Sequence, residues 1–204
     1  MLTTRYKPFF NRLLGPPARF LIRLGFTPNV LTVSSVILTT AVCAWFIRTG
    51  RVVPFCVMMA LIGCLDGLDG VVARASGRVT KFGAYLDAMA DRYVEAIVAL
   101  SVAWVTGEWL WISLVLVGAL LVSYAKARAA MEVAVSNQEW PDLMERMERD
   151  AVFLLGLLVS RLVPWRPWGK DLFWWTLVGL TALIHLTVLQ RMLRAKRLMA
   201  ARQG

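Results

Sequence analysis

Four aspartates gather in one short stretch of the chain, at the ends of two apolar runs. Asp66 and Asp69 are three residues apart, and Asp87 and Asp91 are four apart. Residues at these spacings share one face of an α-helix, so each pair of carboxylates is expected to point the same way. Carboxylates packed together repel one another, which makes divalent cations their natural counterweight. Hard oxygen ligands favour Mg²⁺, Mn²⁺ or Ca²⁺ over zinc, so the spacing predicts a metal-assisted active site.

The residues around these aspartates follow the pattern D-x2-D-G-x2-A-R-x8-G-x3-D-x3-D. The pattern resembles the signature of the CDP-alcohol phosphatidyltransferases, integral membrane enzymes that displace CMP from a CDP-linked lipid with an alcohol acceptor. Every fixed position is met, by Asp66, Asp69, Gly70, Ala73, Arg74, Gly83, Asp87 and Asp91. The resemblance implies that the four aspartates bind two Mg²⁺ or Mn²⁺ ions and that Asp91 is also the general base.

The same stretch suggests a site for the CDP-linked lipid. The motif glycines would clear space for a diphosphate and nucleotide to approach the backbone, and the planar fork of Arg74 suits phosphate oxygens. Without the aspartates, these glycines would indicate only helix packing. The segment TPNVLT also resembles a family feature at the start of the first span. The expected CDP-lipid ligands are Asn29, Thr32, Asp69, Gly70, Ala73, Arg74, Thr80 and Gly83.

A second constellation of basic residues lies near the ends of three later apolar runs, in the segments YAKARA, ERMER and QRMLR. These segments resemble the phosphatidylinositol phosphate synthase branch of the family, with its archaeal archaetidylinositol phosphate relatives. The resemblance implies inositol phosphate as the acceptor, with Lys126, Arg146 and Arg191 matching residues that bind its phosphate in that branch. A six-helix bundle could bring the three segments around one polar cavity next to the aspartates, and the expected acceptor-phosphate ligands there are Lys126, Arg128, Arg146, Arg149, Arg191 and Arg194. Two alternatives remain open: ordinary positively charged membrane anchors, and transfer to glycerol phosphate or another alcohol.

The composition is that of a membrane protein. Hydrophobic residues make up 58% of the 204-residue chain, more than a soluble domain of this size carries. About 20 apolar residues cross a bilayer core, and candidate spans fall at residues 28–47, 52–73, 84–107, 109–131, 150–165 and 171–190. We therefore predict an all-α polytopic membrane protein in which residues 25–204 form one domain with six transmembrane helices.

Residues 1–24 are expected to form a juxtamembrane amphipathic segment. Apolar residues recur there at helical spacing among basic ones, so a helix should lie in the head-group plane; they are Leu2, Tyr6, Phe9, Phe10 and Leu13. The pair Pro16-Pro17 should end this helix, and a short second segment at 18–24 leads into the first span.

The basic residues also predict the orientation in the membrane. Six spans would place all but five of the 23 Lys and Arg on one side, and the exceptions are Arg48, Arg51, Arg161, Arg166 and Lys170. By the positive-inside rule, both termini and the aspartates should face the cytoplasm of a multi-pass protein of the cell membrane. The net charge of +10 does not indicate nucleic-acid binding, because the basic residues are spread over membrane-flanking junctions. Anionic lipid head groups and phosphate-bearing substrates explain them better.

The resemblance implies CDP-diacylglycerol or CDP-archaeol as the donor and a homodimer as the assembly. Two other classes of function remain open. A divalent-cation transporter would use the aspartates as an intramembrane ion site, but it leaves Arg74 and the glycine spacing unexplained. A catalytically silent scaffold would not require four intact aspartates. Release of CMP from a CDP-lipid separates these three hypotheses.

Overall fold

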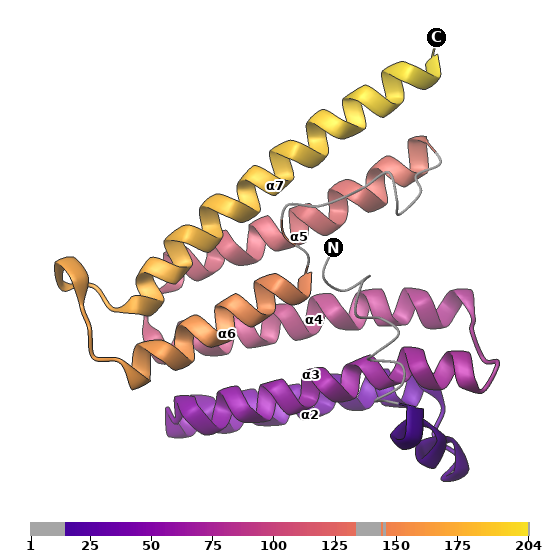
Figure 1. The fold of residues 1–204 in the computed structure, drawn as a ribbon, viewed down its shortest axis with the longest axis horizontal. Coiled ribbons are helices and arrows are strands. Elements are labelled where there is room, and N and C mark those ends of the chain that lie inside the picture. Colours follow the sequence, from indigo (N-terminus) through magenta and orange to yellow (C-terminus); the bar gives the residue numbers. More distant parts are fainter. Residues whose placement is uncertain (1–14, 134–143, 145, 204) are drawn as a thin grey trace. The chain divides into compact units, whose positions relative to one another are not determined.

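The computed structural model describes residues 15–133, 144 and 146–203. These residues are helices joined by short connections and contain no strand, so the all-α prediction is confirmed (Figure 1). After a helical stretch at residues 15–23, the elements are α2 (Pro28–Thr49), α3 (Val52–Ala75), α4 (Lys81–Thr106), α5 (Trp109–Glu132), α6 (Arg146–Leu162), the short 3₁₀ turn η1 (Pro167–Gly169) and α7 (Leu172–Gln203).

Local signals explain where α2 begins and ends. The hydroxyl of Thr27 caps the helix by accepting a hydrogen bond from the Val30 N–H, and Pro28 occupies the first turn, where its missing N–H costs nothing. Gly50 ends the helix in the left-handed conformation, with φ at 62°, and donates its N–H to the Phe46 carbonyl at 2.8 Å. Only Gly50 and Arg51 then separate α2 from α3.

The connection between α3 and α4 is short and tightly bonded. The Ser76 hydroxyl donates to the Val72 carbonyl at 2.7 Å, and Gly77 turns the chain with φ at 66°. Thr80 then caps α4 by accepting a hydrogen bond from the Gly83 N–H at 2.9 Å. This loop places the two halves of the aspartate motif on consecutive helices.

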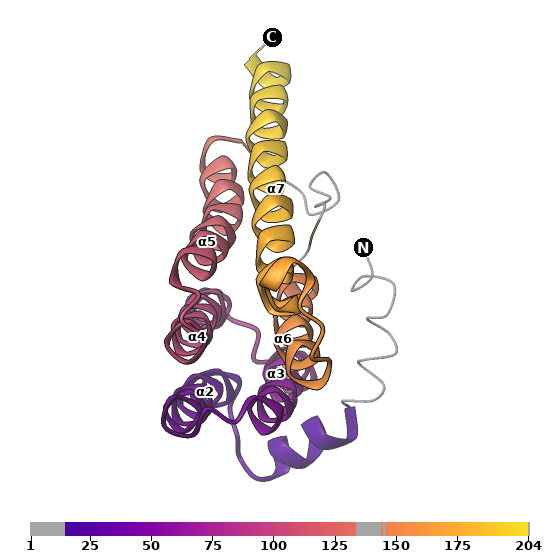
Figure 2. The same cartoon turned by 90° about the vertical axis from the view of Figure 1, so that its left-hand side faces the viewer.

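The chain divides into two compact units, one ending at Thr106 and the other beginning at Gly107. In the first unit, α2 packs against both α3 and α4 (Figure 2). In the second unit, α7 packs against α5 and α6. Edge-to-face contact of Phe153 with Phe173, at 5.4 Å between ring centroids, joins α6 to α7. His185 Nε2 lies 3.2 Å from the Leu114 carbonyl oxygen and joins α7 to α5.

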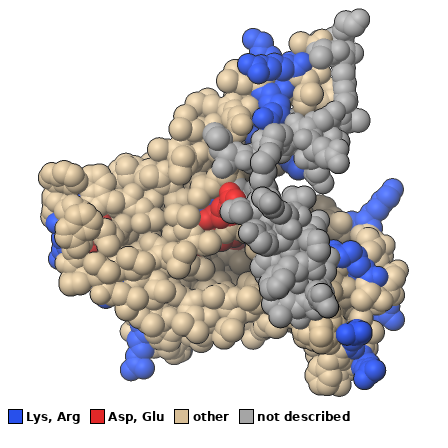
Figure 3. All heavy atoms as spheres, in the orientation of Figure 1, with Lys and Arg blue, Asp and Glu red and all other residues tan. Residues whose placement is uncertain are grey.

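Within the described part of the chain, four helices are long and apolar enough to cross a membrane: α2, α3, α5 and α7 over residues 172–200. Their outer faces carry exposed large apolar side chains, such as Ile37 at 62% and Leu110 at 68% exposure. In Figure 3, Lys and Arg form separate patches and most of the visible surface is uncharged. Soluble proteins rarely expose apolar surface on this scale, so the chain is an integral membrane protein.

The other two predicted spans correspond to helices with less apolar character. Helix α4 is 26 residues long but carries Asp91, Arg92 and Glu95 within its apolar part, and α6 has only 17 residues. The predicted boundaries agree with the helices to within a few residues, except that α7 continues to Gln203. The predicted second N-terminal segment is the helix at 15–23, which begins three residues earlier than expected. The predicted interfacial helix, with Leu2, Tyr6, Phe9, Phe10 and Leu13, lies outside the described residues.

Candidate active site

The four aspartates all belong to the first unit. Asp66 and Asp69 lie on the second half of α3, and Asp87 and Asp91 lie on the first half of α4. Asp69 is the most enclosed of them, with 9% of its surface exposed, and it interacts electrostatically with both Asp66 and Asp87. The charge of Asp69 therefore interacts with those of two other predicted ligands, one on its own helix and one on α4.

Helix α2 supplies hydroxyl groups to the two aspartates of α3. Thr32 Oγ1 donates to Asp69 Oδ2 at 2.6 Å, and Ser35 Oγ lies 3.1 Å from Asp66 Oδ1. Both hydroxyl residues are buried. Each of these two carboxylates thus has one oxygen beside a hydroxyl group of α2. Ser35 was not a predicted site residue; its one sequence signal is a hydroxyl three residues after Thr32, at the same spacing as the two aspartates.

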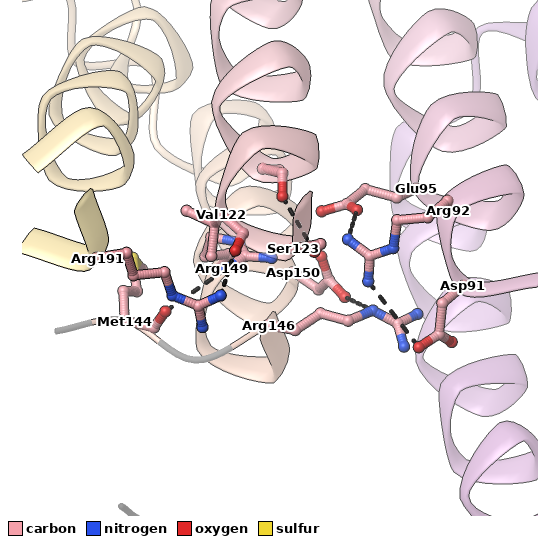
Figure 4. A network of polar contacts seen from close by, with 11 residues as sticks. Asp91, Arg92, Glu95, Val122, Ser123, Met144, Arg146, Arg149, Asp150 and Arg191 are labelled. Carbon is pink, nitrogen blue, oxygen red and sulfur yellow. Dashed lines mark hydrogen bonds and ion pairs between the residues drawn. The ribbon is translucent and has the colours of Figure 1, made fainter. Parts of the chain in front are cut away.

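Asp91 has a basic neighbour on its own helix. Arg92 lies 3.9 Å from the Asp91 carboxylate and 2.6 Å from that of Glu95, so its guanidinium group connects the two acidic side chains (Figure 4). Arg92 and Glu95 are further residues that the sequence did not single out.

The two motif glycines meet side chains of the site itself. A Cβ atom on Gly70 would lie 3.3 Å from Arg74 Nη1. The space predicted to admit a diphosphate at Gly70 is therefore next to the guanidinium group that is predicted to bind it. A Cβ atom on Gly83 would lie 3.0 Å from Thr80 Oγ1 and 3.2 Å from Asn29 Oδ1. The fold thus gathers three of the expected CDP-lipid ligands at the start of α4.

The predicted acceptor ligands all belong to the second unit, where they differ in how deeply they are buried and in which groups they contact. Arg128 is half exposed and forms an ion pair with Glu132 at 2.5 Å, and Arg146 pairs with Asp150 at 3.5 Å. Two others are almost fully enclosed, with exposed fractions of 5% for Arg149 and 6% for Arg191.

Both enclosed arginines donate to backbone carbonyl groups. Arg149 donates to Met144 at 3.5 Å, and Arg191 donates to Val122 (Figure 4). Val122 lies one helical turn before Lys126 on α5. The packing of α7 on α5 therefore brings Arg191 to the turn that precedes Lys126.

Residues 26–189 match the family model of the CDP-alcohol phosphatidyltransferases. The chain belongs to this family. It is an enzyme that transfers a phosphatidyl-type group from a CDP-linked alcohol to an acceptor alcohol, and the resemblance of its aspartate motif is confirmed.

The chain is similar to phosphatidylinositol phosphate synthases and archaetidylinositol phosphate synthases. The phosphatidylinositol phosphate synthase of Corynebacterium glutamicum is 33% identical over 90% of this chain and 84% of its own length. The archaetidylinositol phosphate synthase of Pyrococcus horikoshii is 31% identical over 78% of this chain and 84% of its own length.

A solved structure of the family shares the fold. The Mycobacterium tuberculosis phosphatidylinositol phosphate synthase with CDP-DAG bound superposes with a TM-score of 0.79, at 28% identity, over 90% of this chain and 94% of that one. The same enzyme in complex with manganese and citrate also gives a TM-score of 0.79.

Phosphatidyltransferases of this family use Mg²⁺ or Mn²⁺, and the aspartates have the chemistry to bind such ions. Carboxylate oxygens are the ligands that these hard cations prefer, and Asp69 interacts electrostatically with Asp66 and with Asp87. Among the described residues, however, no three or more His, Cys, Asp and Glu side chains converge closely enough to hold an ion. The donor chemistry of the four aspartates therefore suits the cofactor, and the assignment of individual ligands stays a prediction.

Proposed function

We propose that this chain transfers a phosphatidyl-type group from CDP-diacylglycerol or CDP-archaeol to inositol phosphate. The observation that carries the choice of acceptor is the burial of Arg149 and Arg191 in the second unit. Basic residues that only anchor a helix extend their charged ends to the interface, whereas ionisable groups enclosed among membrane helices usually serve a ligand. A phosphate on the acceptor gives these cations such a ligand, and the activities of the relatives agree with this choice.

In this proposal each substrate has its own set of residues. The CDP-linked lipid is bound by Asn29, Thr32, Asp69, Gly70, Ala73, Arg74, Thr80 and Gly83 in the first unit. The acceptor phosphate is bound by Lys126, Arg128, Arg146, Arg149, Arg191 and Arg194 in the second unit. Arg74 suits the diphosphate because its two guanidinium nitrogens can contact two oxygens at once.

The aspartates carry the chemical step. Asp66, Asp69, Asp87 and Asp91 would hold two divalent cations, which would neutralise charge on the diphosphate and on the departing CMP. Asp91 takes the proton of the acceptor hydroxyl as that oxygen attacks the lipid-side phosphorus. The bond from this phosphorus to the bridging oxygen breaks, and CMP leaves with that oxygen.

We also propose that all six long helices span the membrane, within one transmembrane domain at residues 25–204 that follows a juxtamembrane segment at 1–24. The 17 residues of α6 are at the lower limit for a span, and α4 is long enough at 26. The charged residues of α4 lie near the proposed site, where their function offsets the free-energy cost of placing charges within the membrane. Both termini and the site would face the cytoplasm, and the protein would be a homodimer.

A panel of acceptors tests the proposed function. Purified protein is incubated with CDP-diacylglycerol, Mg²⁺ and one acceptor at a time, and CMP is measured. The acceptors are inositol phosphate, glycerol phosphate, inositol and serine. We expect inositol phosphate to give the fastest release. Faster release with glycerol phosphate would transfer the assignment to that acceptor, and equal rates with inositol and inositol phosphate would reject a phosphate-binding role for the buried arginines.

A further inference from the structure

Helix α2 presents a row of buried hydroxyl groups at Thr32, Ser35 and Thr39. Two of them meet carboxylates of α3, Thr32 at Asp69 and Ser35 at Asp66. Helices α2 and α3 run in opposite directions (Figure 1), so a step of three residues forward on one matches three residues back on the other. The spacing of the hydroxyl groups on α2 therefore matches that of the aspartates on α3.

The other end of this helix pair fixes the register. Phe46 and Phe55 are both fully buried, and their rings stack with centroids 4.0 Å apart and planes inclined by 13°. The two-residue connection at Gly50 and Arg51 allows little sliding. Because protein interiors are closely packed, this contact holds the hydroxyl groups opposite the aspartates.

Each hydroxyl group has one proton to donate, and the two groups are not equivalent because they donate it to different partners. Thr32 Oγ1 lies 2.6 Å from Asp69 Oδ2 and 3.1 Å from the Pro28 carbonyl oxygen. Its proton therefore goes to the carboxylate, at the short distance of a charge-assisted bond. Ser35 Oγ lies 2.8 Å from the Thr32 carbonyl and 3.1 Å from Asp66, so its proton favours its own helix.

We propose that Thr32 is a positioning residue for the divalent cations, acting through Asp69. By donating to Oδ2, it fixes the rotamer of a buried carboxylate and directs the other oxygen to a cation. Partners of this kind orient a metal ligand, and their loss typically weakens metal binding by about 10- to 100-fold. The inference rests on the proposed function in one respect, the assignment of Asp69 as a cation ligand. It gives Thr32 a second role in addition to its proposed contact with the CDP-linked lipid.

The test is Mn²⁺ binding to the full-length protein in detergent, without substrates. Electron paramagnetic resonance of the free ion measures the binding. Thr32→Val keeps the shape and removes the hydroxyl, and we expect its Kd for Mn²⁺ to rise about 10- to 100-fold. Thr32→Ser retains the hydroxyl, so we expect at least a partial return toward the wild-type value. The matched control is Thr39→Val, since Thr39 is fully buried two turns further on the same helix and its hydroxyl has no hydrogen-bond partner among the described residues. This control should leave the Kd unchanged.

Two outcomes would overturn the proposal: a Kd for Thr32→Val within about twofold of wild type, or an equal rise for Thr39→Val, which would indicate a packing effect. Kinetics give a second readout. If Thr32 acts through Asp69, raising Mn²⁺ should restore much of the lost rate, whereas a nucleotide contact would keep the KM for CDP-lipid high at every Mn²⁺ concentration.

The acceptor assignment and the positioning role of Thr32 can be rejected separately. If inositol phosphate proves inactive while Thr32→Val still weakens Mn²⁺ binding, the acceptor is wrong and the positioning role stands. If Asp69→Asn leaves Mn²⁺ binding unchanged, the positioning role falls with the ligand assignment.

Discussion

The guanidinium group of Arg74 lies one helical turn after Gly70, and its Nη1 is 3.3 Å from the point where a Cβ atom on residue 70 would stand. The glycine therefore determines where the arginine can lie. A methyl group there would displace the flexible end of Arg74 by a few tenths of an ångström without disturbing the backbone of α3.

We expect Gly70→Ala to raise the KM for CDP-lipid about tenfold, an increase that corresponds to the loss of one charge-assisted hydrogen bond. The melting temperature should not fall, because alanine favours a helix over glycine by up to about 1 kcal/mol. The control is Gly63→Ala on the same helix, where a Cβ atom meets nothing within 4 Å among the described residues. Equal KM values for the two variants would show that the position of Arg74 does not matter for the donor.

Asp91→Asn should abolish most turnover while leaving Mn²⁺ binding largely intact. It removes the proposed base and keeps an oxygen ligand, and loss of a general base typically lowers kcat by about 10²- to 10⁴-fold. Glu95→Gln is the matched control, because it removes the other acidic partner of Arg92 and no proposed catalytic group. A rate for Asp91→Asn above about a tenth of wild type would mean that another group takes the proton.

Replacement of the buried arginines should affect the acceptor alone. We expect Arg149→Gln and Arg191→Gln to raise the KM for inositol phosphate by about 10- to 150-fold, the value of a hydrogen bond to a charged group. The KM for CDP-lipid should stay the same. Arg191→Lys keeps the charge and should fall between Arg191→Gln and wild type. Arg161→Gln, an exposed cation at the far end of α6, serves as the control. Similar changes in both KM values would argue for a general structural role.

Gly156 allows α6 to approach α7 closely. A Cβ atom on this residue would overlap the Thr176 side chain, so Gly156→Ala should lower stability by about 1–3 kcal/mol through overpacking, more than its gain in helix propensity. Gly179→Ala on α7 meets no described atom within 4 Å and should not destabilise the protein. Thermal unfolding in detergent measures both variants. The double variant with Thr176→Ala should recover part of the loss, and no recovery would show that the strain lies elsewhere.

The helices could be predicted from the sequence because a bilayer requires long apolar runs with internally bonded backbones. Their ends depended on finer chemistry. Helix α4 begins at Lys81 and not at residue 84, since Thr80 caps it, and α6 begins at Arg146 because polar residues extend the helix ahead of its apolar run.

The candidate site could be predicted only in part. The helical period predicted that the aspartates would share faces. It could not reveal that Thr32 donates to Asp69 or that the Ser35 hydroxyl lies beside Asp66, because those partners are 37 and 31 residues away and depend on how α2 packs against α3. The contact of Gly70 with Arg74 depends in the same way on a side-chain rotamer that spacing does not specify.

The most direct test of the transfer reaction is the identity and amount of its lipid product. Purified protein is given CDP-diacylglycerol, Mg²⁺ and inositol phosphate, and mass spectrometry of the lipids is combined with measurement of CMP. The proposed reaction predicts a product that contains both the lipid-side phosphate and the acceptor's own phosphate, formed in equal amounts with CMP. CMP released together with phosphatidic acid, and without the inositol-containing lipid, would contradict transfer to inositol phosphate and indicate hydrolysis of the donor.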